Sequence, residues 1–404
     1  MPLVVQKYGG TSVGDAERIR NVARRIIATK TAGNDVVVVV SAMGDTTDDL
    51  IKLAQQVTEK PGARELDVLL STGELVSATL LAMALKSMGH EAISLSGAQA
   101  GIQTDANHSK ARIVNIDPAR IKSELKKGCI VIVAGFQGIT KDSDITTLGR
   151  GGSDTTAVAL AASLGAKVCE RYTDVDGIYT ADPRQVPEAH KLKEISYEEM
   201  LELATYGSKV IHPRAVELGE IYNIPILVAS SFNDRPGTLI HGGPMEIRNK
   251  ITAITADPDI AKITVVGVPD KPGIAAALFE PLAKAGISVD TIVQNASVKN
   301  ITDLTFTIAS GEVERALKVV KPIAAEIGAR ECVTDPNLAK VSIIGSGIQN
   351  TPGYAARMFS TLFAAGVNIQ LITTSEIRIT VLIAKDKAKE AVKALHKAFE
   401  LEKE

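Results

Sequence analysis

The stretch LVVQKYGGTSVGDA, residues 3–16, decides how the N-terminal half of the chain is to be interpreted. An apolar run ends at Lys7 and two adjacent glycines, and polar residues then lead into a helical pattern over residues 15–29. Glycines let the backbone approach an anion closely, and a helix start presents free N–H groups to it. The stretch also matches Gly-x-Ser-x-Gly at residues 10–14, the nucleophile elbow of α/β hydrolases. It therefore predicts either an anion-binding turn or a nucleophile.

The position of the stretch in the chain separates these two interpretations. A nucleophile elbow follows several strands of its sheet and an oxyanion loop, whereas Ser12 has one predicted strand before it. We therefore interpret the turn as anion-binding. Lys7 on its own could be a lysine that reaches solvent at a strand end. The adjacent glycines instead favour a charge that binds phosphate, although the chain has no Walker sequence.

Composition excludes several classes of protein. The chain has 404 residues, a length typical of two or three domains. A net charge of -2 gives no reason to expect nucleic acid as a partner, and no uncharged apolar run approaches the ~20 residues that span a bilayer. Met1 leads into a strand-like run without the features of a secretory signal, so we expect a cytoplasmic location. No spacing of His, Cys and carboxylate residues resembles a zinc site, and we predict no protein-bound metal.

Up to about residue 240, short β-branched runs alternate with longer helical patterns. The clearest strands are at residues 36–42, 129–138 and 224–230, and the clearest helices at residues 67–88 and 154–164. Continuous apolar strands are typical of a parallel sheet that helices cover on both faces. This part is therefore predicted to be an α/β sandwich, and a Gly-Gly-Pro sequence at residues 242–244 marks where the pattern ends.

Beyond residue 244 the chain contains an internal repeat. A set of residues recurs at a constant spacing of 80, namely Pro272, Gly273, Ala276, Phe279, Leu282, Ala285 and Gly286 as Pro352, Gly353, Ala356, Phe359, Leu362, Ala365 and Gly366. A single spacing over so many matches indicates two copies of one unit. Strand, helix and strand are predicted at residues 262–268, 273–285 and 289–294 and at residues 340–346, 353–365 and 369–374, with a last helix at 385–399. This order is typical of a ferredoxin-like βαββαβ unit.

Two further segments carry residues suited to anion chemistry. LGRGGSDTT, residues 148–156, opens a predicted helix, and Arg150 offers a planar fork for a carboxylate; the alternative is a flexible surface turn. YTDVDGIYTADPR, residues 172–184, holds three aspartates and an arginine, which suits a nucleotide that brings its own Mg²⁺, although Asp-Gly and Asp-Pro also form ordinary turns. Glu74, inside an apolar helical pattern, could face solvent or a ligand. His212 precedes a proline, and we interpret it as structural.

The segments in this order closely resemble the aspartate kinases over essentially the whole chain. The matching segments are KYGGTS (7–12), VVVVSAM (37–43), LLSTGE (69–74), TTLGRGGSDTTA (146–157), YTDVDGIYTADPR (172–184), EEMLELATYGSKVIHPRA (198–215) and SFNDRPGTLI (231–240). VPDKPGIAA (268–276) and TTSEIRITV (373–381) resemble the paired ACT domains of that family. The resemblance implies an amino acid kinase three-layer sandwich with a mainly parallel sheet at residues 1–244. It also implies a linker and strand at 245–261 and ferredoxin-like ACT domains at 262–337 and 338–404.

The implied reaction is ATP-dependent phosphorylation of the L-aspartate side-chain carboxylate to 4-phospho-L-aspartate, the first step of lysine, threonine and methionine biosynthesis. ATP is expected to arrive with Mg²⁺. Regulation is implied through an amino acid effector, threonine and/or lysine, bound between ACT domains of a homodimer that could pair into a tetramer. Met245 lies where some relatives start a separate regulatory subunit. The alternatives are a catalytically inactive amino acid sensor and a kinase for a related amino acid such as glutamate.

The resemblance also assigns roles to residues of this chain. Catalysis is implied for Lys7, Asp174 and Lys209, and nucleotide binding for these three with Tyr8, Gly9, Gly10, Thr173, Tyr179, Asp182 and Arg184. The aspartate pocket is implied for Ser41, Thr47, Glu74, Arg150, Gly151 and Ser153, with Arg150 on a substrate carboxylate and Glu74 on the ammonium. The effector site is implied for Asp270, Gly273, Ala275, Asp290, Gln294, Asn368, Ile369, Ser375 and Glu376.

Two positions depart from the pattern of that family. Arg171 stands where an aliphatic strand residue is expected, so it either changes the nucleotide side of the site or reaches solvent. ASVKNIT, residues 296–302, replaces the acidic, glycine-containing turn expected after the first effector strand. This second departure bears on which effector binds rather than on catalysis.

Overall fold

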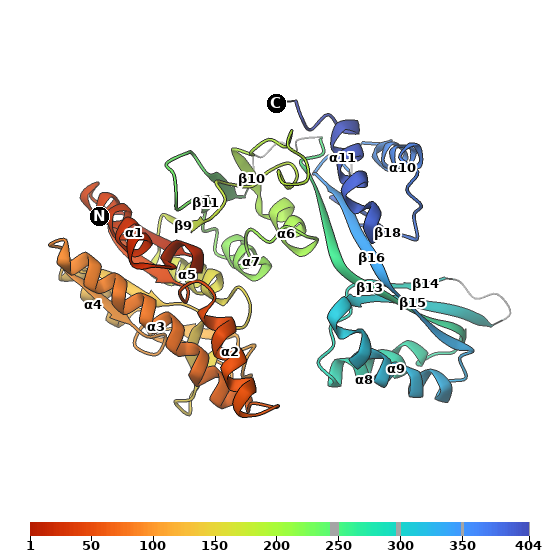
Figure 1. Cartoon of the computed structure of the whole chain (residues 1–404), viewed down its shortest axis with the longest axis horizontal. Helices are drawn as coiled ribbons and strands as arrows, with labels where there is room; N and C mark the ends of the chain where they lie inside the picture. Colours follow the sequence, from red (N-terminus) through yellow and green to blue (C-terminus); the bar gives the residue numbers. More distant parts are fainter. Residues whose placement is uncertain (243–249, 296–299, 349–350, 404) are drawn as a thin grey trace. The chain divides into compact units, whose positions relative to one another are not determined.

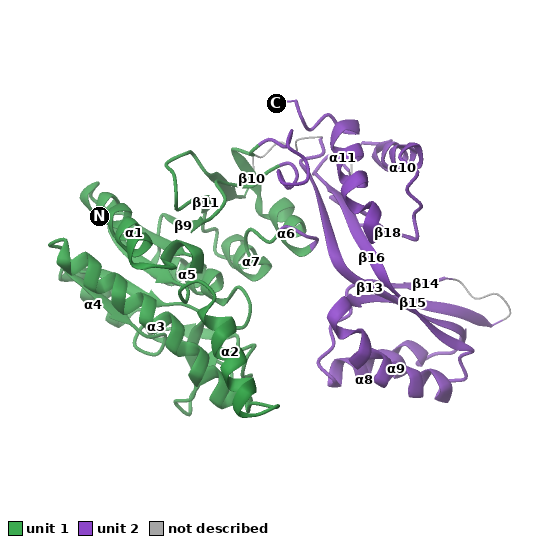
Figure 2. Cartoon of the chain, in the orientation of Figure 1, with its two compact units in different colours: residues 1–179, 191–205, 209–246 green, residues 180–190, 206–208, 247–404 purple. Residues whose placement is uncertain are grey.

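The computed structural model of the chain describes residues 1–242, 250–295, 300–348 and 351–403. They form two compact units, which Figure 2 colours separately. Unit 1 comprises Met1–Tyr179, Lys191–Thr205 and Lys209–Glu246, and unit 2 comprises Thr180–His190, Tyr206–Ser208 and Ile247–Glu404. Two short segments of the N-terminal half thus belong to unit 2. The candidate internal start, Met245, lies outside the described residues.

Unit 1 is built on an eight-stranded sheet in the order β10-β12-β11-β9-β1-β2-β6-β3 (Figure 1). The strands are β1 Leu3–Tyr8, β2 Asp35–Val40, β3 Ala92–Leu95, β6 Ile130–Ala134, β9 Val168–Thr173, β10 Glu194–Ser196, β11 Ile226–Ser230 and β12 Thr238–His241. Neighbours are parallel except for β11 and β12. A small second sheet joins β4 Ile102–Thr104, β5 Ile113–Ile116, β7 Gln137–Ile139 and β8 Ile145–Thr147. The predicted mainly parallel sheet is confirmed.

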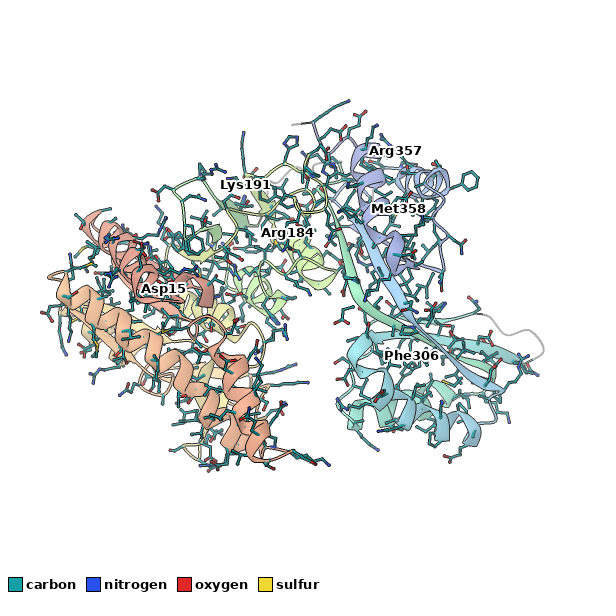
Figure 3. All side chains as sticks on the ribbon, in the orientation of Figure 1. Asp15, Arg184, Lys191, Phe306, Arg357 and Met358 are labelled. Atoms are coloured by element: carbon teal, nitrogen blue, oxygen red, sulfur yellow. The ribbon has the colours of Figure 1, made fainter. Side chains whose placement is uncertain are left out.

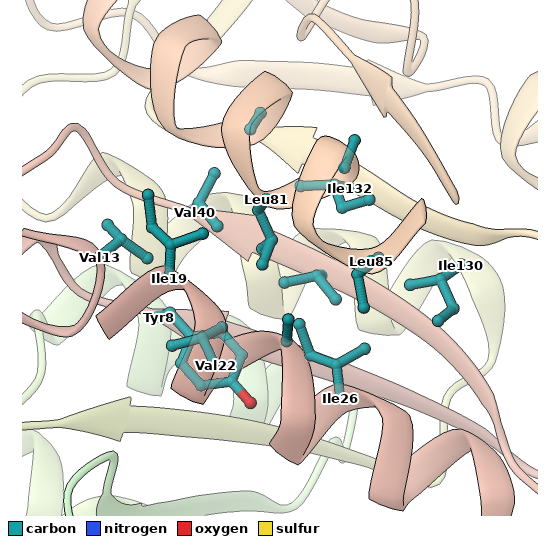
Figure 4. Packing of buried hydrophobic residues seen from close by; sticks show 14 of the residues in the cluster. Tyr8, Val13, Ile19, Val22, Ile26, Val40, Leu81, Leu85, Ile130 and Ile132 are labelled. Carbon is teal, nitrogen blue, oxygen red and sulfur yellow. The ribbon is translucent and has the colours of Figure 1, made fainter. Parts of the chain in front are cut away.

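Helices cover both faces of the large sheet. They are α1 Ala16–Thr31, α2 Thr46–Val57, α3 Ala63–Ser87, α4 Ala119–Lys126, α5 Gly152–Leu164, α6 Tyr197–Thr205 and α7 Pro213–Ile221. Val36, Val38 and Val40 of β2 pack with residues of α1 and α3 in one apolar core, part of which Figure 4 shows. By length and composition α3 could cross a membrane, but half of its apolar window is buried within the protein. It is therefore consistent with a core helix of unit 1.

The predicted strand at residues 129–138 is divided by the structure. It forms β6 and β7, and Phe136 between them has φ 70°, a conformation that a bulky residue rarely adopts. Its N–H group donates to Thr156 Oγ1 of α5. The break therefore carries the chain from the large sheet to the small one. An unbroken apolar run gives no sign of such a break.

Unit 2 contains a six-stranded antiparallel sheet in the order β14-β15-β13-β16-β18-β17. Its elements are β13 Ala253–Pro269, α8 Ile274–Lys284, β14 Ile292–Gln294, β15 Ile301–Ala309, α9 Val313–Glu326, β16 Glu331–Ile344, α10 Tyr354–Ala364, β17 Leu371–Thr374, β18 Arg378–Ala384 and α11 Ala388–Ala398. Both predicted repeats are present, each with two helices. Phe306 and Met358, labelled in Figure 3, are buried in the separate cores of the first and second copies.

The two copies share their longest strands. The first residues of β13, 253–257, pair with residues 340–344 of β16, whereas residues 260–266 pair with residues 331–338. The described residues after α11 form no strand, and the first residues of β13, upstream of the first copy, pair with β16 of the second copy. Residues 253–261, expected to lie in a linker and strand, are therefore part of the sheet that joins both copies.

Candidate active site

The candidate site lies where four neighbouring strands of unit 1 end. Strands β9, β1, β2 and β6 are adjacent and parallel, so their carboxyl ends meet at one edge of the sheet. Lys7, Ser41, Gly135 and Thr173 lie at or directly after these ends. In open α/β sheets ligands bind outside this edge, because loops and helix starts gather there. The fold thus brings together residues that the sequence separates by more than a hundred positions.

A buried group of charges lies at the centre of this edge. Lys7 Nζ is 2.6 Å from Asp154 Oδ1, and Arg171 Nε is 3.1 Å from Asp154 Oδ2. We call Lys7, Asp154 and Arg171 the Lys7 cluster. Lys7 and Arg171 are partners in the register of β1 and β9, and Asp154 comes from the first turn of α5. Arg171 therefore does not reach solvent, which decides between the two alternatives that the sequence left for it.

Burial and charge act in opposite directions on this cluster. Burial alone would raise the pKa of Asp154, but the positive charges of Arg171 and Lys7 outweigh it and hold that pKa well below its usual value. Burial lowers the pKa of Lys7, and the adjacent carboxylate of Asp154 partly offsets this. Asp154 is thus an anion under all ordinary conditions and fixes the position of the two cations.

The glycine turn after β1 is held tightly against the next strand end. A Cβ atom on Gly10 would lie 2.8 Å from the carbonyl oxygen of Ala42, so only glycine fits. The N–H group of Gly9 donates to Tyr172 O at 3.3 Å, which leaves it less available to phosphate than the sequence implied. Ser12, in the short 3₁₀ helix Gly10–Val13, donates its hydroxyl to Ser231 Oγ at 2.8 Å. That serine is a structural link and is not paired with a histidine as a nucleophile would be.

Tyr8 contributes to the core and not to the site through its side chain. Its ring is fully buried and stacks on Tyr172, with 5.0 Å between the ring centroids. Tyr8 lies among the residues of α1 and α3, on the opposite face of the sheet from α5 (Figure 4). Burial raises the pKa of the phenol well above its usual value. Of the predicted nucleotide contacts of Tyr8, only those of its backbone remain possible.

Glu74 is a buried carboxylate beside the end of β2. It lies in α3, is 3% exposed, and accepts a hydrogen bond from the N–H group of Ala42 at 3.2 Å through Oε1. Its Oε2 atom is buried and has no hydrogen-bond partner among the described residues. Burial raises the pKa of Glu74 to about 7. Glu74 does not face solvent, and its unpaired oxygen is suited to an ammonium group.

The loop that carries Arg150 is held in place by contacts with His212 and Arg214. Gly151 has φ 71°, and a Cβ atom there would lie 2.2 Å from the ring of His212. Arg214, in the first turn of α7, donates to Leu148 O at 2.9 Å and also reaches Ala111 O. Arg150 itself is exposed, whereas Ser153 is buried against Gly135. Arg150 is therefore exposed on a loop whose backbone these contacts hold in place.

A second anchor of this loop is Asp67, which is fully buried in α3. It accepts hydrogen bonds from Thr147 Oγ1 at 2.5 Å and from the N–H group of Ser109 at 3.0 Å, and it pairs with His108 Nδ1 at 2.8 Å. Thr147 is the last residue of β8, directly before the Arg150 loop. The network joins α3 to the strand that delivers the loop. No polar residue in this network was identified as functional from the sequence.

The predicted nucleotide residues divide between the two units. In unit 1, Thr173 Oγ1 donates to Asp174 Oδ1 at 3.0 Å, Asp174 is exposed, and Tyr179 donates to Asp176 at 2.6 Å. In unit 2, Asp182 and Arg184 pair with each other, and Arg184 (Figure 3) is mostly exposed. Lys209 is exposed in unit 1 and follows directly after the unit 2 segment Tyr206–Ser208. The structure thus does not gather the whole predicted set into one place within a unit.

Thr47 completes the predicted acceptor set in the first turn of α2, after the end of β2. Among the described residues there is no group of three or more His, Cys, Asp or Glu side chains that could hold a metal ion. Asp154, which lies between Lys7 and Arg171, was not selected by sequence analysis. Its signal was available, because a lysine buried at a strand end needs a carboxylate partner and Asp154 follows the second glycine cluster.

The predicted effector residues lie at corresponding places in the two copies of unit 2. Asp270, Gly273 and Ala275 are at the start of α8, and Asp290 and Gln294 are near β14. Asn368 and Ile369 precede β17, and Ser375 and Glu376 follow it. Ser375 and Glu376 line a cavity of about 510 Å³ with Gly353, Tyr354 and Thr374. Of the departure at residues 296–302, residues 296–299 lie outside the described part of the chain.

Comparisons with known proteins agree with this architecture. The chain matches the amino acid kinase family over residues 2–230 and ACT domains over residues 263–322 and 341–399. It is 53% identical to an aspartokinase from Mycolicibacterium smegmatis, over 99% of this chain and 97% of that protein. It is 52% identical to an aspartokinase from Pseudomonas aeruginosa, over 100% of this chain and 98% of that protein.

Solved structures give the same result. The crystal structure of Escherichia coli aspartokinase III in complex with aspartate and ADP has a TM-score of 0.82 and 26% sequence identity, covering 98% of this chain and 99% of that one. The same enzyme in complex with lysine and aspartate has a TM-score of 0.75, again at 26% identity and with the same coverage. These proteins combine a kinase with bound aspartate, ADP and lysine.

Proposed function

The chain belongs to the aspartokinases of the amino acid kinase family, and from that premise we propose which of its residues transfer a phosphoryl group from ATP to the side-chain carboxylate of L-aspartate. The observation that carries the proposal is the meeting of the Lys7 cluster, the Gly9-Gly10 turn and Glu74 at one edge of the sheet. This edge offers a cationic centre for phosphate with an acceptor pocket beside it.

The phosphoryl group in flight is assigned to Lys7 and the turn after it. A phosphoryl transfer needs in-line alignment and positive charge more than covalent chemistry. Lys7 Nζ is 2.6 Å from Asp154 Oδ1, so its position is fixed before the substrate binds. Asp174 and Lys209 are assigned to the nucleotide phosphates. Mg²⁺ is proposed to enter with ATP and to keep much of its water.

The aspartate pocket is assigned to Ser41, Thr47, Glu74, Arg150 and Ser153. Glu74 pairs with the substrate ammonium through its unsatisfied Oε2 atom, and Arg150 binds a substrate carboxylate as a fork. The attacking side-chain carboxylate is ionised at neutral pH, so no general base is required. Because the pocket contains charges of both signs, a substrate lacking either group leaves a protein charge unpaired and is rejected.

We assign feedback regulation to unit 2, with lysine and/or threonine as the effector. The E. coli aspartokinase III complex with lysine is the related example. The edge strands β14 and β17 carry exposed apolar residues, Ile292 and Ile372, which are suited to a second copy of the chain. A homodimer through unit 2 follows, and a tetramer is its possible extension. An effector acts only through its differential affinity for two arrangements of the protein.

The proposed setting is the cytoplasm, at the start of lysine, threonine and methionine biosynthesis. Met245 as an internal start of a separate regulatory subunit is a further proposal. It is tested by an immunoblot of cell lysate with an antibody against the C-terminus. A single band at full length contradicts it.

The decisive experiment measures ADP release by the purified chain with ATP, Mg²⁺ and L-aspartate, in parallel with L-glutamate, and repeats it with lysine, threonine and both. Aspartate-dependent turnover that falls with an amino acid supports both the residue assignment and the regulation. Turnover with glutamate at an equal rate contradicts the pocket assignment. If aspartate gives no turnover while lysine or threonine raises the melting temperature, the chain is a sensor.

A further inference from the structure

Arg171 is a buried cation that the roles assigned above do not use. Its side chain is 11% exposed and approaches the same carboxylate as Lys7. Because Lys7 and Arg171 are register partners on adjacent parallel strands, their side chains lie on the same face of the sheet, the face that α5 covers.

The hydrogen-bonding groups of Arg171 are only partly satisfied within the protein. Its Nε atom lies 3.1 Å from Asp154 Oδ2, whereas its buried Nη1 atom has no hydrogen-bond partner among the described residues. Buried donors are normally paired, and leaving one unpaired costs free energy. A guanidinium that keeps an open donor beside the glycine turn is therefore suited to binding an anion.

The charge balance of the Lys7 cluster supports the same conclusion. Two cations share one carboxylate, and the pKa of Asp154 is held low enough to keep that carboxylate ionised. The cluster therefore carries one net positive charge in a site where water is largely excluded. A buried charge of this kind is stable when a counter-ion is bound. In the proposed reaction, the transferred phosphoryl group of ATP brings negative charge to this edge of the sheet.

We propose that Arg171 is a further catalytic residue, whose guanidinium binds an oxygen of the transferred phosphoryl group beside Lys7. This inference rests on the proposed function. In the step, a side-chain oxygen of aspartate forms a bond to the γ-phosphorus, the bond to the β-phosphate oxygen breaks, and ADP leaves with the electron pair. Arg171 keeps its proton throughout, because its role is to stabilise charge on the oxygens in flight.

The test compares Arg171→Leu and Arg171→Lys with the unchanged full-length chain. Arg171→Leu leaves Asp154 paired with Lys7, so the variant retains a balanced cluster. We expect kcat to fall about 100-fold, at the lower end of the range found when one transition-state donor is removed. Arg171→Lys keeps the charge but loses the fork and is expected to lose about 5-fold. Arg25→Leu is the matched control, because Arg25 stacks on Tyr172 from the opposite face of β9.

A binding measurement separates a catalytic role from a structural one. The probe is ADP with Mg²⁺ and L-aspartate, with and without aluminium fluoride, which imitates the phosphoryl group in flight. The proposal requires Arg171→Leu to weaken binding of the aluminium fluoride complex by at least tenfold while ADP alone binds as before. Equal binding of the fluoride complex, or equal weakening of both ligands, overturns it.

Two controls keep this result separate from other failures. If Arg171→Leu does not fold, Arg171→Lys decides, and binding of the fluoride complex by that variant as tightly as by the unchanged chain also overturns the proposal. Absence of aspartate-dependent turnover in the unchanged chain would instead contradict the proposed function. The two failures are therefore distinguishable.

Discussion

Each unit contains a lysine that is almost fully buried on a central strand, and the two lysines are used differently. Lys7 in unit 1 is 6% exposed and Lys340 in unit 2 is 4% exposed. Lys7 shares its carboxylate with Arg171, whose Nη1 atom has no hydrogen-bond partner among the described residues. Lys340 pairs with Asp290 and lies over the ring of Tyr206 at 5.1 Å. The first arrangement is built to receive an anion, whereas the second is a contact among residues of the protein itself.

The repeat within unit 2 shows what is specific about Lys340. In the antiparallel pair β13 and β16, Lys262 lies opposite Asp335 and Lys340 lies opposite Asp257, so the two lysines occupy equivalent positions. Lys262 donates to Gln370 Oε1 at 2.7 Å, where Lys340 instead meets the carboxylate of Asp290. Lys340 therefore has an ion pair where Lys262 has a neutral contact. A predicted effector residue, Asp290, takes part in the charged one.

The largest effect is expected from removing the charge of Lys7 from the Lys7 cluster. Lys7→Met leaves Asp154 with Arg171 alone and takes away the charge that faces the phosphoryl group. We expect kcat to fall by about a thousandfold, the upper range for one transition-state stabiliser. The measurement is ADP release at saturating ATP and aspartate. Lys52→Met, at an exposed lysine of α2, is the control and should change kcat by less than twofold. A loss below tenfold would place the phosphoryl group elsewhere.

A pH titration tests Glu74, a buried carboxylate whose Oε2 atom has no hydrogen-bond partner among the described residues. Its folded-state pKa is about 7, above that of the unfolded chain, so protonation at low pH removes the partner of the substrate ammonium. We expect the KM for aspartate to rise about tenfold for each pH unit below 7. Glu74→Gln should raise this KM about a hundredfold at pH 8 and remove the dependence. A KM of the unchanged chain that stays flat from pH 8 to 5 contradicts this assignment.

Glu74→Gln should weaken binding of aspartate but increase the stability of the folded protein. A carboxyl group whose pKa is raised by folding makes the folded state bind more protons, so it costs stability as the pH rises from about 4.5 to 7. Glu74→Gln should therefore stabilise the protein at pH 8, by about 2 kcal/mol. Thermal unfolding of the variant and the unchanged chain at pH 8 and pH 4.5 measures it. The difference in melting temperature should be smaller at pH 4.5.

The features of the fold that the sequence predicted are encoded in local patterns. The apolar strands and the helix that Asp15 caps are encoded in short stretches, and the repeat of unit 2 is encoded in a constant spacing. The residues missed from the site depend on contacts over long sequence separations. Arg171 meets Lys7 because parallel β1 and β9 are neighbours, and Asp154 meets both because α5 packs against β1. Residues 253–257 of β13, upstream of the first copy, pair with β16 of the second copy. No local pattern specifies which strands become neighbours.

The contact of Lys340 provides the next test. Tyr206 belongs to unit 2, and three residues later in the chain stands Lys209, assigned to the nucleotide phosphates. An effector ammonium that binds Asp290 competes with Lys340, so Lys340→Met should change the inhibitory concentration of lysine or threonine by about tenfold, with a smaller change in kcat. Lys262→Met is the matched control at the equivalent position and should change it by less than twofold. Equal effects of both variants would mean that the charge of Asp290 has no special role.

The smallest effect concerns how unit 2 holds the segment Thr180–His190. The buried His396 Nε2 lies 2.9 Å from Thr180 Oγ1, and burial lowers the pKa of His396. A histidine whose folded-state pKa is lowered is neutral in the folded protein. Its stability contribution is therefore complete above pH 6.5 and is lost as the pH falls below that value.

Thermal unfolding between pH 7 and 5 measures this contribution. Because the nearby carboxylates of Glu402 and Glu188 partly offset the effect of burial, we expect His396→Gln to remove a small part of the pH-dependent loss of stability. If His396→Gln unfolds with the same pH dependence as the unchanged chain, folding does not lower the pKa of His396. The segment that carries Asp182 and Arg184 would then be held by its apolar contacts, those of Ala181 and Val186, rather than by this hydrogen bond.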